Sequence, residues 1–165
     1  MIRALVICLA VLPAPGMTQP LDPADVGRLA NCLDGFEGDI SAARQTCSGL
    51  IERPCLDSSE GATTVGMVNC AAREELAWEE LRAEVFARLE AAAQASDEYY
   101  TEQNLSDYAT ALDSLRAADT AWATWRDLEC RARADDHGNG SMRQIVAGFC
   151  RSELIRERVL TYWFR

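Results

Sequence analysis

The sequence predicts an all-α protein: a disulfide-stapled bundle of three long helices with a short helical N-terminal extension. Apolar residues recur at steps of three, four or seven along three long segments, which is the spacing of one face of a helix. No segment alternates apolar and polar residues well enough to predict a strand. Six of the seven cysteines lie beside the predicted turns, where disulfides would join neighbouring helices.

Residues 1–16 are typical of a secretory signal peptide. Arg3 supplies the positive charge, residues 4–12 form an apolar run of nine, and two prolines end it. Nine apolar residues are too few to cross a bilayer, so an uncleaved anchor is the weaker alternative and no stable membrane span is expected. Cleavage after Gly16 removes Cys8 and leaves six cysteines, an even number that indicates disulfides formed in an oxidising compartment. We therefore expect a periplasmic or secreted protein.

The short helical N-terminal extension is expected over residues 17–54. Its first helix is expected over residues 24–33, with Asp22 or Asp25 as the cap and a proline in the first turn. A second helix is expected over residues 40–51 and stops before the next proline.

Residues 55–165 predict the main helical domain. After a loop over 55–66, the first long helix is expected over 67–95 and the second over 107–134. The third follows a turn at 135–140 that is rich in Asp, Asn and Gly.

Each long helix has an apolar stripe that predicts its core-facing side. Helical spacing alone accounts for the aromatic residues in these stripes, so we interpret them as core and not as a ligand site. Ser106 and Ser141 are the expected N-caps of the second and third helices. The stripes comprise Met67, Ala71, Trp78, Leu81, Val85, Leu89 and Ala92; Tyr108, Leu112, Leu115, Ala118, Trp122, Trp125 and Leu128 or Glu129; and Ile145, Phe149, Leu160 and Trp163.

The six remaining cysteines allow fifteen pairings, and sequence alone does not select one rigorously. Nearest-neighbour pairing places one bridge across each predicted connection between helices. The pairs would be Cys32–Cys47, Cys55–Cys70 and Cys130–Cys150. No pair has the Cys-x-x-Cys spacing of a zinc site and the chain has one histidine, so no metal or other cofactor is expected.

Composition and charge exclude several classes of function. The formal net charge is −10, from 26 acids and 16 arginines, so nucleic acid is a poor partner. No phosphate-binding loop or nucleophile elbow is present, and we assign no catalytic residues and expect no enzyme. A run of acids on the first long helix is interpreted as a solvated face. These acids are Glu74, Glu75, Glu79 and Glu80.

One polar cluster near the end of the second long helix is more specific. Arg126 and Glu129 are three residues apart and share a face with Trp122. Glu129 lies near the apolar stripe and would need a partner if buried, and Arg158 is available if the last helix packs alongside. We interpret this cluster as a structural ion pair between helices.

The order of these residues resembles the LprI-type lysozyme inhibitor domain over about residues 55–163. The resemblance rests on Cys70-Ala71, Leu81, the Trp122…Arg126…Glu129-Cys130 block, Gly140-Ser141, Cys150 and Arg158. It implies a helical, disulfide-bonded, exported protein that is not an enzyme. The chain differs in the first long helix, where the family tends to have Asp, then Leu-Asn, then Tyr, and this chain has Trp78, Leu81-Arg82 and Val85. Residues 17–54 look like an addition.

The resemblance implies binding to lysozyme or another cationic cell-wall hydrolase. Many lysozymes are strongly basic with an acidic cleft, and a chain this acidic would be steered toward them. The turn before the last helix is the candidate inhibitory element, with His137, Asn139, Ser141 and Arg143 as its contact residues. Simple capping by Ser141 and a solvated Arg143 are the plainer alternatives. An envelope scaffold without inhibitory activity is the alternative function.

Overall fold

The computed structural model describes residues 21–165, and over these residues the protein is all-α. The predicted signal peptide lies outside the described residues. Three short helices come first: α1 (Pro23–Asp34), α2 (Ile40–Cys47) and α3 (Glu52–Leu56). After a 3-10 turn at Glu60–Ala62, three long helices follow: α4 (Thr64–Glu102), α5 (Ala111–Asp135) and α6 (Met142–Trp163).

The N-terminal helices begin where the sequence supplies caps. Asp22 caps α1 by accepting a hydrogen bond from the Ala24 backbone N–H at 2.9 Å, and Asp39 caps α2. The second helix is shorter than the predicted 40–51. The chain leaves the helix after Cys47 because Gly49 adopts a φ of +69°, a conformation that glycine allows, and α3 starts three residues later.

The long helices differ from the prediction at their ends. Helix α4 has 39 residues and runs from a cap at Thr63, so it is longer than the predicted 67–95 in both directions. Helix α5 starts at Ala111 and not at 107; Ser106 begins a separate 3-10 turn, Ser106–Tyr108, and so is not the N-cap. No helix among residues 21–165 combines the length and apolarity needed to cross a membrane.

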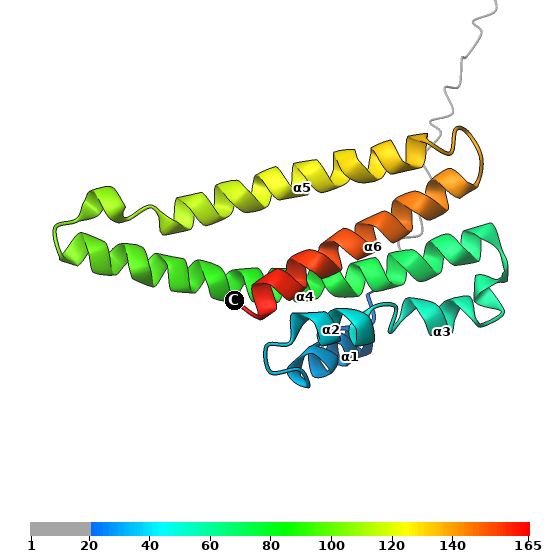
Figure 1. The fold of residues 1–165 in the computed structure, drawn as a ribbon, viewed down its shortest axis with the longest axis horizontal. Coiled ribbons are helices and arrows are strands. Elements are labelled where there is room, and N and C mark those ends of the chain that lie inside the picture. The colour runs from blue at the N-terminus through cyan, green and yellow to red at the C-terminus, as the bar shows by residue number, and fades with distance from the viewer. Residues whose placement is uncertain (1–20) are drawn as a thin grey trace, which may run out of the picture.

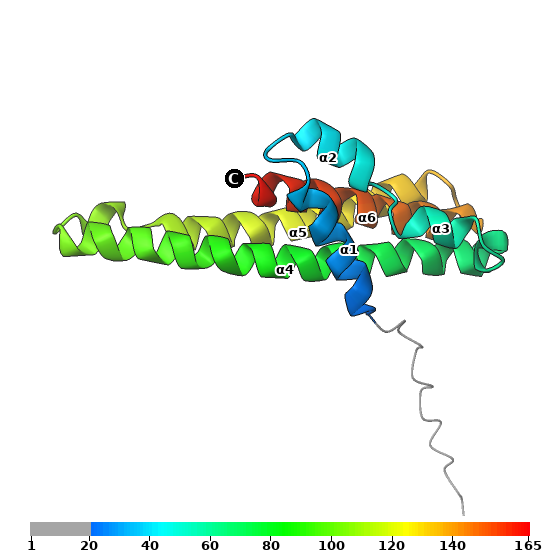
Figure 2. The ribbon, with the colours of Figure 1, turned by 90° about the horizontal axis from the view of Figure 1, so that it is seen from below.

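The principal core lies between α4, α6 and the N-terminal helices. Trp78 of α4 is fully buried, as its stripe predicts, and packs with Leu29 of α1, Ala43 of α2 and Val159 of α6. The N-terminal extension is therefore part of the main core. Figures 1 and 2 show α1 and α2 lying against the α4–α6 layer.

Helix α5 contributes little to that core. Its buried residues are Cys130 and Ala134, near its C-terminal end, and Trp122 packs against the edge of the core. The prediction that its stripe faces the core is wrong for Tyr108 and Trp125, which are 68% and 49% exposed. Leu128, one of the two alternatives for the end of the stripe, is 58% exposed. In Figure 1, α5 lies along α6 at one end and beside α4 alone at the other, so only part of its stripe meets neighbours.

Three disulfides join the elements: Cys32–Cys47, Cys55–Cys70 and Cys130–Cys150. This is the nearest-neighbour pairing. Cys32–Cys47 links α1 to α2, Cys55–Cys70 links α3 to α4, and Cys130–Cys150 links α5 to α6. Each bridge therefore restrains one connection between helices.

Candidate inhibitory surface

The turn between α5 and α6 is an exposed loop on a rigid base. All residues from 135 to 142 are exposed, including His137 and Asn139, and Gly138 has a φ of +59°. Below the turn, Cys130 and Cys150 are buried with Leu154 in a small second core, and their Cα atoms are 5.5 Å apart. The disulfide limits the separation of the two helices, so the turn is held in place before any partner arrives.

Arg143 forms an ion pair and a backbone hydrogen bond with the turn that precedes it. Its Nη2 lies 2.5 Å from Oδ1 of Asp135, and its side chain is 43% exposed. The Arg143 backbone N–H also donates to the Gly140 carbonyl at 3.1 Å. Because this ion pair is exposed, it contributes little stability, and a partner carboxylate can compete with Asp135 for the guanidinium.

Ser141 occupies the N-cap position of α6, but its side chain makes no capping hydrogen bond. The expectation that it caps the helix by its hydroxyl is wrong because its backbone is helical, with φ −61° and ψ −26°, and not extended. Its exposed hydroxyl makes no hydrogen bond within residues 21–165, which leaves it open to a partner.

A shallow groove of about 430 Å³ lies beside the turn, between α5 and α6. Arg131, Arg143 and Arg151 line it together with one acid, Asp127. Arg151 is held by Glu75 of α4 at 2.9 Å, whereas Arg131 is exposed and has no ion pair within the described chain. The groove therefore presents arginine side chains on an otherwise acidic protein, a chemistry suited to carboxylates.

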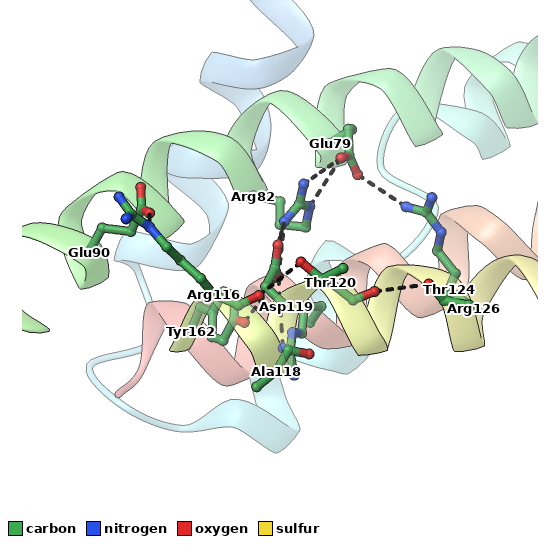
Figure 3. A network of polar contacts seen from close by, with 11 residues as sticks. Glu79, Arg82, Glu90, Arg116, Ala118, Asp119, Thr120, Thr124, Arg126 and Tyr162 are labelled. Carbon is green, nitrogen blue, oxygen red and sulfur yellow. Dashed lines mark hydrogen bonds and ion pairs between the residues drawn. The ribbon is translucent and has the colours of Figure 1, made fainter. Parts of the chain in front are cut away.

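Three of the four residues predicted to form an ion-pair cluster, Trp122, Arg126 and Arg158, come together where α4, α5 and α6 meet. Figure 3 shows Arg126 there with the neighbouring polar residues Glu79, Arg82, Asp119 and Tyr162. Trp122 is the centre of this cluster: the guanidinium carbons of Arg82, Arg126 and Arg158 lie 5.7, 5.3 and 5.1 Å from its ring centroid. These distances are within the range of cation–π attraction. Trp122, Arg126 and Arg158 therefore meet, as the sequence suggests, but they meet around an aromatic ring.

Glu129 is not part of this cluster, which corrects the prediction. It pairs with Arg133 one turn along α5, with Oε1 2.9 Å from Nε, and is about one-third exposed. The acids of the cluster are Asp119 and Glu79. Asp119 lies 2.9 Å from Nη1 of Arg82 and accepts a hydrogen bond from the Tyr162 hydroxyl at 3.2 Å, and Glu79 pairs with Arg82 at 2.7 Å. Burial raises the pKa of the Tyr162 phenol.

Glu74 is a further correction, since it is 1% exposed and not on a solvated face. Its carboxylate accepts hydrogen bonds from the backbone N–H groups of Gly49, Ile51 and Glu52 at 2.9, 3.1 and 2.8 Å, and from the Trp78 indole at 3.1 Å. Glu74 thus caps the start of α3 from another helix. No local spacing reveals this role, because its backbone partners are 22 to 25 residues away.

Glu52 lies next to that carboxylate. Burial, and then repulsion from Glu74, raise the pKa of Glu52 from 4.5 to about 7, although Arg156 and Arg53 oppose the shift. Glu52 therefore titrates near neutral pH. The described residues contain no group of three His, Cys, Asp or Glu side chains placed to hold a metal ion.

Comparison with known proteins places this arrangement in a family. The family model described as "Lysozyme inhibitor LprI" matches residues 55–161, and the chain belongs to this family. The match covers the Cys55–Cys70 and Cys130–Cys150 bridges, the turn before α6 and the Trp122 cluster apart from Tyr162. It begins after α1 and α2, which nevertheless complete the principal core.

Two relatives are similar over most of the chain. An uncharacterized 17.7 kDa protein from the puhA 5′ region of Rhodobacter capsulatus is 25% identical over 155 residues, 92% of this chain and 94% of that protein. Because the alignment covers 92% of this chain, it spans residues 17–54, so that relative also has a counterpart of the N-terminal extension. An uncharacterized protein of Rhizobium meliloti is 27% identical over 113 residues, 68% of this chain and 81% of that protein. No solved structure matches the chain.

Proposed function

We propose that this protein is an exported inhibitor of lysozyme or a related basic cell-wall hydrolase, and that the turn between α5 and α6 enters the enzyme's cleft. The observation that carries the proposal is the match to the lysozyme inhibitor family across the residues that build and clamp this turn. The disulfides and the signal-like first 16 residues support a periplasmic or secreted site of action.

The chemistry of the turn supports the same target. A glycan hydrolase cleft carries carboxylates, and Arg143 and Arg131 are exposed or half-exposed arginines beside the turn. Arg143 exchanges Asp135 for a carboxylate of the enzyme, and His137, Asn139 and Ser141 supply further donors. The net charge of −10 attracts a basic enzyme over a longer range, and this attraction weakens as salt screens it.

The clearing of a cell-wall suspension by hen egg-white lysozyme tests the proposal. We expect the wild-type protein to slow clearing at micromolar concentration in low salt. Arg143→Ala should weaken inhibition at least tenfold, which corresponds to about 1.4 kcal/mol. The matched control is Arg165→Ala at the C-terminus, which changes the net charge equally and should inhibit like the wild type.

Comparison of Arg143→Ala with Arg165→Ala separates loss of a specific contact from a change in net charge. Both make the protein more acidic, so long-range attraction alone predicts equal or stronger inhibition by both variants. A Cys130→Ser/Cys150→Ser variant should also lose inhibition and about 3 kcal/mol of stability, because the turn is no longer clamped. Clearing at the full rate with a large excess of wild-type protein in low salt would overturn the proposal.

A further inference from the structure

The far end of the α4–α5 hairpin protrudes from the rest of the molecule. Helix α6 ends at Trp163, whose ring lies under the guanidinium of Arg88, 5.0 Å away. Helix α4 continues from there to Glu102, a length of about 20 Å at 1.5 Å per residue. Figure 1 shows this part of α4 and the start of α5 extending past the C-terminus. We call residues 89–115 the hairpin tip.

The hairpin tip exposes a cluster of tyrosines. The ring centroids of Tyr99 and Tyr100 are 5.6 Å apart, and those of Tyr100 and Tyr108 are 6.3 Å apart. Their exposed fractions are 59%, 37% and 68%, in the order Tyr99, Tyr100, Tyr108, and Leu105 beside them is 44% exposed. Tyrosine combines a large contact area with low conformational entropy, which makes such a cluster typical of a protein-binding surface.

Charge at the hairpin tip is all of one sign. The segment contains no Lys, Arg or His, and one of its acids, Glu90, pairs with Arg116 just beyond it, at 2.6 Å. Its acids are Glu90, Asp97, Glu98, Glu102, Asp107 and Asp113. Glu98, Glu102, Asp107 and Asp113 are exposed and have no ion pair within residues 21–165. The tyrosine rings are therefore surrounded by negative charge. A cation placed over one of these rings is attracted both by the ring and by the nearby carboxylates.

Hydrogen bonds between α4 and α5 hold the hairpin tip in place. The Asp97 carboxylate of α4 accepts hydrogen bonds from the backbone N–H groups of Ala111 and Leu112 at 2.8 and 3.0 Å. It thereby caps α5 from the opposite helix, while Thr110 in the cap position makes no capping bond. A surface held in this way loses little entropy when it binds.

We propose that the hairpin tip docks onto a protein surface rich in lysine and arginine, with partner cations over the rings of Tyr99, Tyr100 and Tyr108. A basic partner is indicated because the tip has acidic and aromatic groups and no base to pair with an acidic one. The hairpin tip lies at the other end of α5 from the turn at 136–141, so the two surfaces act separately. This proposal does not require that the turn inhibits lysozyme.

Deca-lysine is a suitable probe because it has no cleft and reports on the cationic surface alone. We expect it to shift the backbone amide NMR signals of residues 97–108 in the full mature chain, and to bind more weakly as salt rises. Glu98→Gln/Glu102→Gln/Asp107→Asn should reduce the affinity at least tenfold. Asp97 is left unchanged because it caps α5.

The matched control neutralises three exposed acids elsewhere, by Asp34→Asn/Glu37→Gln/Asp57→Asn, and should change the affinity less than threefold. Tyr99→Leu/Tyr108→Leu keeps the charge and should reduce the affinity about fivefold, as expected for two exposed cation–π contacts. Equal losses in the charge variant and its control, or shifts spread over all acidic surfaces, would overturn the proposal. Signals at the hairpin tip that respond to peptidoglycan fragments and not to deca-lysine would also overturn it.

Discussion

The carboxylate of Glu74 accepts a hydrogen bond from the indole of Trp78 one turn along α4, at 3.1 Å, with both residues fully buried. The same carboxylate satisfies three backbone N–H groups at the start of α3. One acid therefore fixes the position of the largest core side chain and of the α2–α3 connection. Four donors share this single buried charge, so its removal leaves all four unpaired.

Replacing Glu74 with alanine should lower the free energy of unfolding by at least about 3 kcal/mol, because several buried donors lose their acceptor. Urea unfolding followed by circular dichroism measures this change. Glu80→Ala, an exposed acid on the same helix, should change stability by no more than about 0.5 kcal/mol. A loss below about 1 kcal/mol for Glu74→Ala would show that water replaces the carboxylate.

Asp119 should be the most sensitive acid of the Trp122 cluster. Its carboxylate contacts Arg82 and the Tyr162 hydroxyl and is 16% exposed. Asp119→Ala should cost about 2 kcal/mol, because the arginines around Trp122 then repel one another with less compensation. Asp113→Ala, an exposed acid six residues earlier on α5, is the control and should be near neutral. Equal effects of the two substitutions in urea unfolding would contradict the role assigned to Asp119.

Glu52 should make stability fall as pH rises from 4.5 to about 7. In this window the folded protein keeps a proton that the unfolded chain has already released, since the pKa is about 7 when folded and 4.5 otherwise. Glu52→Gln carries no such proton. The variant should match the wild type below pH 4.5 and have the higher melting temperature at pH 8. Melting curves from pH 4 to pH 8 that remain parallel would contradict the raised pKa.

The two hydroxyl residues at helix starts should respond differently to alanine. Thr63 accepts a hydrogen bond from the Gly66 backbone N–H at 3.0 Å, so Thr63→Ala should cost about 1 kcal/mol. Ser141 makes no capping bond, so Ser141→Ala should cost less than about 0.5 kcal/mol. Paired urea titrations of the two variants provide the comparison. A larger loss at Ser141 would indicate a cap that forms in solution.

Helical periodicity and turn composition were sufficient to predict the class of fold and the order of the helices. Helix ends were less predictable. Gly49 interrupts a segment whose residues otherwise favour a continuous helix. The start of α5 is capped by Asp97, a residue of α4, and no local pattern reveals that contact. The apolar stripe of α5 led to a wrong prediction of burial for a different reason. A stripe marks which side of a helix can be buried, and in this fold α5 has too few neighbours to cover Trp125.

The partners of the charged residues were also only partly predictable from the sequence. Trp122, Arg126 and Arg158 come together, but the acids near them could not be selected from the sequence. Glu129 is closer in sequence to Arg126 than Glu79 is, yet Glu79 lies on the facing side of α4 and makes the contact, at 3.4 Å. With 26 acids available, only the packing of α4, α5 and α6 decides which of them are buried.

The central claim is that the turn clamped by Cys130 and Cys150 occupies the cleft of a basic cell-wall hydrolase. The most direct measurement is calorimetric binding of the mature protein to hen egg-white lysozyme in low salt, with and without a saturating N-acetylglucosamine oligosaccharide in the cleft. We predict binding at micromolar concentration or tighter, and its loss when the oligosaccharide is present. Absence of binding, or binding that the oligosaccharide leaves unchanged, would contradict the claim.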